Sequence, residues 1–262
     1  MQVLKFGGSS VADARNMSKV VDIVTNAVDR DRTILVASAI SGCTDTLIRI
    51  GTLASQRDES YKGLIDGLQQ RHHVIIKDFL PREKQEESLE ICDALFDSLR
   101  SIAQGVFLLG ELSPASLDAI QGFGELWSTK ILATKLASIG ISTKWIDSRT
   151  IIRTIAKGDK NIVDVQKTYS RVNEMVENNP ITQLFVLPGF IASDKQGRTT
   201  TLGRGGSDYT ASLYAVGCKA RILEIWTDVP GMMTSNPKTV PTARTISNIS
   251  YKAALELSHF GA

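Results

Sequence analysis

The chain has 262 residues, of which 42% are apolar and 22% charged, and its 30 Lys and Arg residues nearly balance its 28 Asp and Glu residues. This composition is typical of a globular protein and excludes a disordered chain, a collagen-like repeat and a coiled-coil rod. There is no basic run of the kind that binds nucleic acid, and no span approaches the ~20 apolar residues needed to cross a bilayer. We therefore expect a cytoplasmic protein with no nucleic-acid or membrane partner.

Cysteines and histidines are few and scattered. Cys43, Cys92 and Cys218 form no C-x-x-C pair, and His72 and His73 lie in a charged stretch with helical periodicity. The sequence therefore predicts neither a disulfide framework nor a metal site built from protein ligands. The first residues lack the apolar core of a signal peptide. Because the chain stops at Ala262 without a polar tail, we expect a fragment of a longer chain.

The first 55 residues predict the order strand, helix, strand, helix. Apolar residues at helical spacing indicate helices at 13–29 and 44–54. The strands are expected at 3–6 and 33–39. The second of these is an almost unbroken apolar run, which is typical of a strand buried on both faces of a parallel sheet.

Residues 56–121 have a different character. Charge is dense, and apolar residues recur every three or four positions, which predicts a helical excursion of two or more helices with Pro81 between them. Ser113 followed by Pro114 is typical of an N-cap and the first residue of a further helix. Such a block could form a lid or a small subdomain.

From residue 122 the alternation of strands and helices returns, which predicts an α/β fold with a mostly parallel sheet and helices on both faces. A turn at 194–197 predicts a hairpin, and Ser250 is expected to cap a last helix after a turn-rich stretch at 228–248. The expected helices are 125–138, 164–177, 208–216 and 251–258, and the expected strands are 143–147, 182–192 and 220–227.

The segment Lys5-Phe-Gly-Gly-Ser-Ser10 is the first candidate for chemistry. A strand runs into two glycines and two hydroxyl residues before a helix. Glycines let backbone N–H groups approach an anion, and a helix N-terminus adds partial positive charge. Lys5 could place an ammonium beside the same anion. The alternative is a plain tight turn with an extended lysine.

The segment from Thr199 to Tyr209 is the second candidate, because three glycines surround Arg204 just before Ser207 opens a helix. This pattern gathers a guanidinium, backbone amides and a helix dipole, which favours anion binding over a flexible hairpin exit. Asp208 could bind an ammonium while Arg204 binds a carboxylate. Alternatively, Asp208 is an acid that favours the helix N-terminus.

Three further segments are ambiguous alone. Trp226-Thr-Asp-Val-Pro-Gly231 turns sharply after a strand, and Glu125 and Thr44 each lie at a helix start, where an acid or a cap is ordinary. Taken together, two anion-seeking glycine loops on separate strands suggest one site for two negatively charged groups. A nucleoside triphosphate and a carboxylate substrate fit that requirement.

These motifs together resemble aspartate kinase, and they run in the family's order from residue 5 to the end of the chain. The resemblance implies the amino-acid-kinase fold, an open three-layer αβα sandwich with a helical insertion at 56–121. It implies transfer of the ATP γ-phosphoryl group, with Mg²⁺ held mainly by the phosphates, to the side-chain carboxylate of L-aspartate. This reaction opens the biosynthesis of lysine, threonine, methionine and isoleucine.

The resemblance also assigns residues. It implies Lys5 and Asp208 as catalytic residues, with Lys5 beside the transferring phosphoryl group, and no protein ligand for a metal. The aspartate-binding positions correspond to Thr44, Glu125, Arg204 and Ser207, with Asp208 beside them. The nucleotide-binding positions correspond to Lys5, Gly7, Gly8, Ser9, Thr227, Asp228, Met233 and Lys238.

The sequence departs from the family on the nucleotide side and at its end. Asn236-Pro-Lys238 stands where Asp-Pro-Arg is expected, and Met233 stands where tyrosine is frequent. The family continues past Ala262 with a lysine that contacts ATP, and then with regulatory ACT domains. We therefore expect 1–262 to be a single catalytic domain without its regulatory region, from a protein that is a homo-oligomer at full length.

Other functions stay open at this stage. One is a kinase of the same fold that acts on glutamate, acetylglutamate or a nucleoside monophosphate. Another is a truncated, non-catalytic nucleotide-binding module. A dinucleotide-dependent oxidoreductase is disfavoured because no G-x-G-x-x-G follows the first strand.

Overall fold

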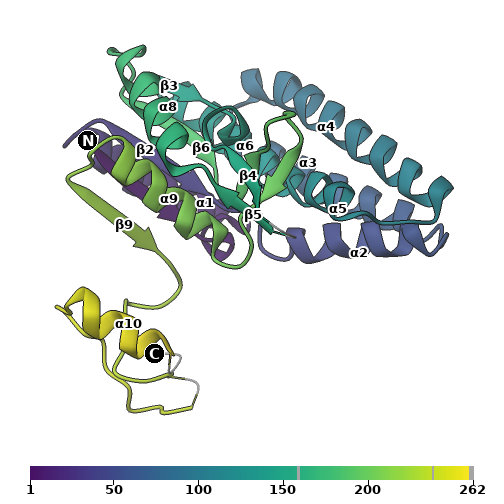
Figure 1. Ribbon diagram of the computed structural model, residues 1–262. Helices are drawn as coiled ribbons and strands as arrows, with labels where there is room; N and C mark the ends of the chain where they lie inside the picture. The colour runs from purple at the N-terminus through teal and green to yellow at the C-terminus, as the bar shows by residue number, and fades with distance from the viewer. Residues whose placement is uncertain (158–159, 238, 260–262) are drawn as a thin grey trace. The chain divides into compact units, whose positions relative to one another are not determined.

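Five parallel strands form the central sheet of the computed structural model, in the order β3-β6-β2-β1-β9 (Figure 1). The structure describes residues 1–157, 160–237 and 239–259. β1 lies between β2 and β9, with Leu4 opposite Leu35 on one side and Phe6 opposite Trp226 on the other. In sheet order the strands are Thr143–Trp145, Leu184–Pro188, Thr33–Ala37, Gln2–Phe6 and Ile222–Trp226.

Alternate residues of the inner strands point to opposite faces of the sheet, and helices cover both faces. Leu4, Leu35 and Val186 pack in one core with α1 (Ala14–Val28) and α6 (Phe123–Ser138). Val3, Ile34 and Phe185 pack in a second core with α8 (Val165–Glu177) and α9 (Gly206–Gly217). Strands buried on both faces read as continuous apolar runs. The predicted three-layer αβα architecture with a parallel sheet is confirmed.

The predicted excursion is a group of helices gathered at one end of the first unit (Figure 1). Pro81 separates the two longest, and the Ser113 hydroxyl accepts a hydrogen bond from the backbone N–H of Ser116 at 3.1 Å, as expected for a cap. Phe96 stacks on Trp127 of α6 with ring centroids 4.0 Å apart, which fastens the group to the sheet layer. The helices of the excursion are α3 (Tyr61–Phe79), α4 (Arg82–Leu109) and α5 (Pro114–Gln121), and α2 (Cys43–Ser55), predicted separately at 44–54, packs against all three.

The predicted strand 182–192 is wrong as one element. β6 ends at Pro188, and β7 (Ile191–Ser193) leaves the sheet to pair antiparallel with β8 (Thr199–Thr201), which confirms the hairpin. The break falls at Gly189 and Phe190, where Phe190 adopts a φ of +65° that a strand does not allow.

The remaining predicted elements match the structure, with shifted ends. The predicted helix 208–216 begins earlier, at Gly206, and the predicted strand 143–147 ends at Trp145. Four short elements lacked a periodic signal because they are too short to show one: η1 (Gly8–Val11), α7 (Ser148–Ile151), β4 (Thr154–Lys157) and β5 (Lys160–Val163).

The chain divides after Trp226 into two units, Met1–Trp226 and Thr227–Ala262. Within its described residues, the second unit has a turn-rich stretch and the helix α10 (Tyr251–His259). The Ser250 hydroxyl accepts from the backbone N–H of Ala253 at 3.3 Å, as predicted for a cap. That both units act as one catalytic domain stays a prediction. No helix among the described residues is long and apolar enough to span a membrane.

We expect Phe96→Ala to destabilise the protein by about 3–5 kcal/mol, because it removes a fully buried ring and its stacking on Trp127. Urea unfolding measures this loss. The matched control is Leu108→Ala on the same helix, where the side chain is 67% exposed and the expected change is within about 0.5 kcal/mol. Equal losses in the two variants would contradict this account of how α4 is held.

Candidate active site

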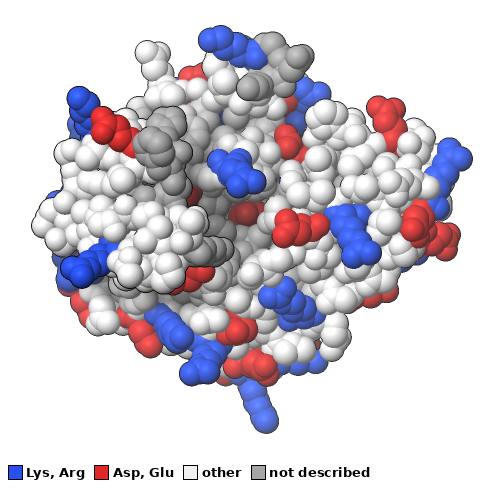
Figure 2. Space-filling model, turned by 90° about the horizontal axis from the view of Figure 1, so that it is seen from below, with Lys and Arg blue, Asp and Glu red and all other residues white. Residues whose placement is uncertain are grey.

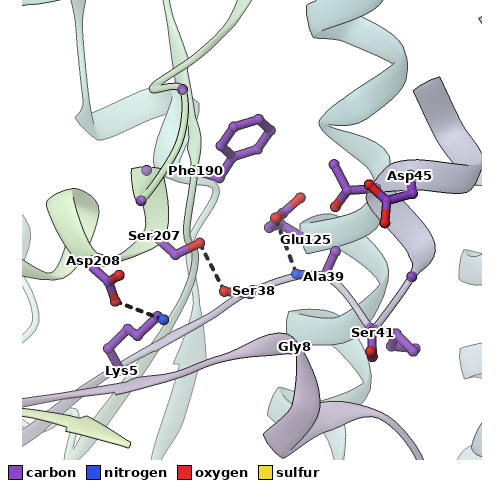
Figure 3. A pocket seen from close by; sticks show the side chains of 16 residues that line it. Lys5, Gly8, Ser38, Ala39, Ser41, Asp45, Glu125, Phe190, Ser207 and Asp208 are labelled. Atoms are coloured by element: carbon purple, nitrogen blue, oxygen red, sulfur yellow. Dashed lines mark hydrogen bonds and ion pairs between the residues drawn. The ribbon is translucent and has the colours of Figure 1, made fainter. Parts of the chain in front are cut away.

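A cavity of about 410 Å³ lies where β1, β2 and β6 end (Figure 3). Ligands bind at the carboxyl ends of parallel strands because loops from several strands converge there. The segments that follow these strands and the start of α9 supply most of the lining. The lining residues are Lys5, Gly8, Ser38, Ala39, Ile40, Ser41, Gly42, Thr44, Asp45, Glu125, Phe190, Gly203, Gly205, Gly206, Ser207 and Asp208.

Lys5 and Asp208 form an ion pair at one side of the cavity. The Lys5 Nζ lies 2.7 Å from Asp208 Oδ1, and the Lys5 side chain is largely buried whereas that of Asp208 is 46% exposed. Lys5 extends from the buried end of β1, and Asp208 lies in the first turn of α9. A buried ammonium with a partly solvated partner is available to a second anion that enters the cavity.

The glycines after β1 bring the backbone close to the next loop. A Cβ atom added at Gly8 would lie 2.9 Å from the carbonyl oxygen of Ala39, which is closer than packing allows. Gly7 lies beside the Lys5 ammonium, since a Cβ there would be 3.7 Å from Nζ. The glycines therefore leave backbone without side chains beside a positive charge, an arrangement that suits a phosphate group.

The loop after β2 connects the two sides of the cavity. Ser38 Oγ donates to Ser207 Oγ at 3.0 Å, and the backbone carbonyl of Ser38 accepts from Ser128 at 2.8 Å. In the view of Figure 3, this serine pair lies between the Lys5–Asp208 pair and Glu125. These hydroxyls hold α9 and α6 to the same short segment.

Glu125 is a buried acid with one oxygen unpartnered. Its side chain is 3% exposed, and Oε1 accepts from the backbone N–H of Ala39 at 3.2 Å. Oε2 is buried and has no hydrogen-bond partner among the described residues. Burial raises the pKa of the Glu125 carboxyl to about 8, more than the Ala39 N–H lowers it. A buried acceptor without a donor favours a ligand that brings one.

The structure brings together part of the predicted site. Six predicted residues line the cavity: Lys5, Gly8, Thr44, Glu125, Ser207 and Asp208. Gly7 and Ser9 border it in the same loop. Arg204 is exposed and does not line the cavity, although Gly203 and Gly205 on either side of it do.

The other predicted residues belong to the second unit. Thr227 donates from its hydroxyl to the Asp228 carboxylate at 3.1 Å, and Met233 forms an isolated bridge with Thr245. Lys238 lies outside the described residues. These four predicted nucleotide-binding residues therefore belong to a different unit from the cavity.

Some cavity residues were missing from the sequence-based prediction. Ser38 comes directly after β2 and Ser41 lies three residues further on. The rule that ligands bind at the carboxyl ends of parallel strands could therefore have found both. Phe190 follows Pro188-Gly189, a turn signal inside the run interpreted as one strand. Asp45 resembles an ordinary helix acid, and no sequence signal marks it.

Acidic and basic residues are interspersed on the face shown in Figure 2, without an extended basic patch. In the ranges that the structure describes, no group of three or more His, Cys, Asp or Glu side chains could hold a metal ion.

Glu125 generates a pH prediction. Its pKa rises from an ordinary 4.5 to about 8 on folding, so the folded state binds one proton more than the unfolded state between these values. The contribution of Glu125 to the free energy of unfolding is fully present below about pH 4.5 and is lost as the pH rises through about 8.

We therefore expect the wild type to lose stability relative to Glu125→Gln between about pH 5 and about pH 8, as measured by urea unfolding. Glutamine keeps an acceptor for the Ala39 N–H but does not titrate. A stability difference between the two proteins that is constant across this range would contradict the raised pKa.

Comparisons with known proteins agree with this geometry. A model of the amino acid kinase family matches residues 1–262. Lysine-sensitive aspartokinase 3 of Escherichia coli is 33% identical over 262 residues, which cover 99% of this chain and 56% of the relative. The chloroplastic bifunctional aspartokinase/homoserine dehydrogenase 2 of Arabidopsis thaliana is 30% identical over 261 residues, which cover 99% of this chain and 28% of the relative.

A solved structure matches the fold. The crystal structure of E. coli aspartokinase III in complex with aspartate and ADP has a TM-score of 0.87 at 31% identity, over 99% of this chain and 56% of that chain. The chain thus spans about half the length of the E. coli relative and less than a third of the plant relative. With the family model matching from the first residue to the last, the chain belongs to the amino acid kinase family.

Proposed function

We propose that this chain phosphorylates the side-chain carboxylate of L-aspartate with ATP, forming 4-phospho-L-aspartate. Two solved or curated relatives support the proposal: one is named an aspartokinase, and one is a structure of such an enzyme with aspartate and ADP. The full-length activity and the substrates of this protein are part of the proposal, because the chain spans only part of those relatives.

The observation that carries the proposal is the pairing of two opposite features in one cavity. A buried ammonium, Lys5, lies at one side, and a buried acid with an unpartnered oxygen, Glu125, lies at the other. An amino acid that accepts a phosphoryl group needs both. Its own ammonium would donate to Glu125 Oε2 and favour the ionised carboxylate, while Lys5 would stabilise the phosphoryl oxygens.

This chemistry needs no base from the protein. The aspartate side chain has an ordinary pKa of about 3.9, so it is already an ionised nucleophile at neutral pH. Its oxygen forms a bond to the γ-phosphorus while the bond from that phosphorus to the β,γ-bridging oxygen breaks and ADP leaves. Catalysis is then positioning and charge stabilisation, to which Lys5 and the Gly7–Gly8 backbone would contribute.

Arg204 is proposed to bind the α-carboxylate of aspartate. The glycines on either side have φ values of +71° and +72°, a region that residues with a Cβ rarely adopt. The guanidinium has no ion-pair partner among the described residues. A substrate carboxylate would supply one. Thr44, Ser207 and Asp208 would complete the amino-acid site.

The nucleotide phosphates would lie against Lys5, Gly7, Gly8 and Ser9. That Thr227, Asp228, Met233 and Lys238 bind the nucleotide stays a prediction from the family resemblance. The absence of side chains at Gly7 and Gly8 leaves room for a phosphate beside Lys5, and Mg²⁺ would supply further charge neutralisation on the phosphates. The cytoplasmic setting and the homo-oligomeric full-length protein stay predictions.

The direct test is acyl-phosphate formation from Mg·ATP and L-aspartate, trapped as the hydroxamate with hydroxylamine. We expect product with L-aspartate and none with L-glutamate or without an amino acid. Nucleotide binding by calorimetry without hydroxamate would contradict catalysis by this chain and favour a non-catalytic module. A preference for an N-acylated acid would overturn the substrate.

We expect Arg204→Ala to lower kcat/KM for aspartate about 30-fold, because a charged hydrogen bond to a carboxylate contributes roughly 2 kcal/mol. ATP affinity, measured by calorimetry, should stay unchanged. Arg198→Ala is the matched control, since Arg198 is an exposed arginine nearby whose partner is Asp194. Unchanged aspartate kinetics in Arg204→Ala would remove Arg204 from the site.

A further inference from the structure

Arg71, on α3, the first helix of the excursion, bridges two loops of the site. Its Nη1 donates to the backbone carbonyl of Ser41 at 2.8 Å, and its Nη2 donates to the backbone carbonyl of Ala12 at 3.1 Å. Ser41 lines the cavity in the loop after β2. Ala12 ends η1, the short helix that begins at Gly8 in the loop after β1.

Among the described residues, few hydrogen bonds join these two loops, although Val11 and Ile40 lie in the same buried core. The ladder between β1 and β2 extends only to the hydrogen bond from the N–H of Ser38 to the carbonyl of Phe6. Beyond it the loops touch where Gly8 meets Ala39 and Ser41. The Arg71 guanidinium spans the loops further along, between the end of η1 and the start of α2.

The guanidinium is committed to this contact. No carboxylate lies within 4.0 Å of Arg71 in the described ranges, so its charge is directed at the two carbonyls rather than neutralised in an ion pair. A planar fork reaches two acceptors in fixed directions, whereas a lysine presents one point charge on a flexible stem. The contact therefore requires arginine rather than any cation.

The helix that carries Arg71 is itself held firmly. The next residue, His72, is fully buried, and its Nδ1 lies 2.7 Å from the carbonyl oxygen of Leu68. Its ring packs against Phe96 and Trp127, with centroids 5.5 and 4.8 Å away. Burial lowers the pKa of His72 to about 4, so it is neutral near pH 7. The packing of His72 therefore fixes the rotation of α3 about its axis, and with it the direction in which Arg71 points.

We propose that Arg71 is a positioning residue: it holds the loops after β1 and β2 at the separation that phosphoryl transfer between their ligands requires. The proposal rests on the proposed function, in which the first loop binds the nucleotide phosphates and the second borders the amino-acid site. It also gives the helical excursion a purpose at the site besides covering the sheet.

The test compares Arg71→Ala and Arg71→Lys with the control Arg100→Ala in the full chain. Arg100 also tethers α3, through Asp66 at 2.8 Å and Gln69 at 2.6 Å, but it contacts neither loop. The first readout, amide hydrogen exchange, needs no catalysis. We expect faster exchange at 8–13 and at 41–46 in both Arg71 variants and not in Arg100→Ala. Unchanged exchange in both segments would overturn the proposal.

The second readout is hydroxamate kinetics. We expect kcat to fall about tenfold to a hundredfold in Arg71→Ala, because small misplacements of reacting groups have effects of this size. The Kd for Mg·ADP should change little, and millimolar guanidinium should restore part of the rate to Arg71→Ala but not to Arg100→Ala. If Arg71→Ala only unfolded part of the protein, the fraction of protein that binds Mg·ADP would fall and guanidinium would not restore the rate. That result would contradict the positioning role.

The outcomes separate this proposal from the proposed function. A wild type that makes no aspartyl hydroxamate contradicts the function, and hydrogen exchange alone then decides whether Arg71 holds the loops. An active wild type whose Arg71 variants match Arg100→Ala in rate and exchange leaves the function standing and overturns the role of Arg71. If Arg71→Ala does not fold, Arg71→Lys decides by the same two readouts.

Discussion

The position of Ala39 is the constraint on which the site depends. A Cβ atom added at Gly8 would lie only 2.9 Å from the Ala39 carbonyl oxygen. A Cβ atom added at Gly124 would lie only 2.6 Å from the Ala39 Cβ. The Ala39 N–H is the donor to Glu125. Ala39, in the loop after β2, therefore limits how closely the glycine loop can pack on one side and how closely α6 can pack on the other. A larger residue at either glycine would push the loop or the buried acid out of place.

The acids of the cavity differ because their environments differ. Asp208 is half exposed and faces the Lys5 ammonium. Glu125 is buried, has a backbone N–H on one oxygen only, and its pKa is raised to about 8. Asp208 is thus paired within the protein, whereas Glu125 keeps one buried oxygen without a hydrogen-bond partner among the described residues. A buried acid with a strongly raised pKa inside a cavity is typical of functional sites.

The sequence predicted the layers, the sheet and much of the cavity because those features have local signals. Buried parallel strands are apolar runs, and glycine loops before helices mark Lys5, Gly8 and Ser207. Contacts between distant segments have no such signal. Arg71 lies 30 residues from Ser41 and 59 from Ala12, in a stretch that the sequence predicted only as a helical excursion. The break at Phe190 was missed because the apolar run continues through it, although Gly189 marked the turn.

The position of β1 between β2 and β9 has a consequence for synthesis of the chain. Its first neighbour, β2, begins 31 residues after Gln2, but its second neighbour pairs Gln2 with Ile222. Since proteins are made from the N-terminus, β1 is an edge strand until almost the whole first unit has left the ribosome. Pairing over so long a separation is slow because loop closure must come first. The loop after β1, whose Gly7 N–H donates to the carbonyl of Trp226 at 3.4 Å, is among the first parts of the site to be made and the last to be completed.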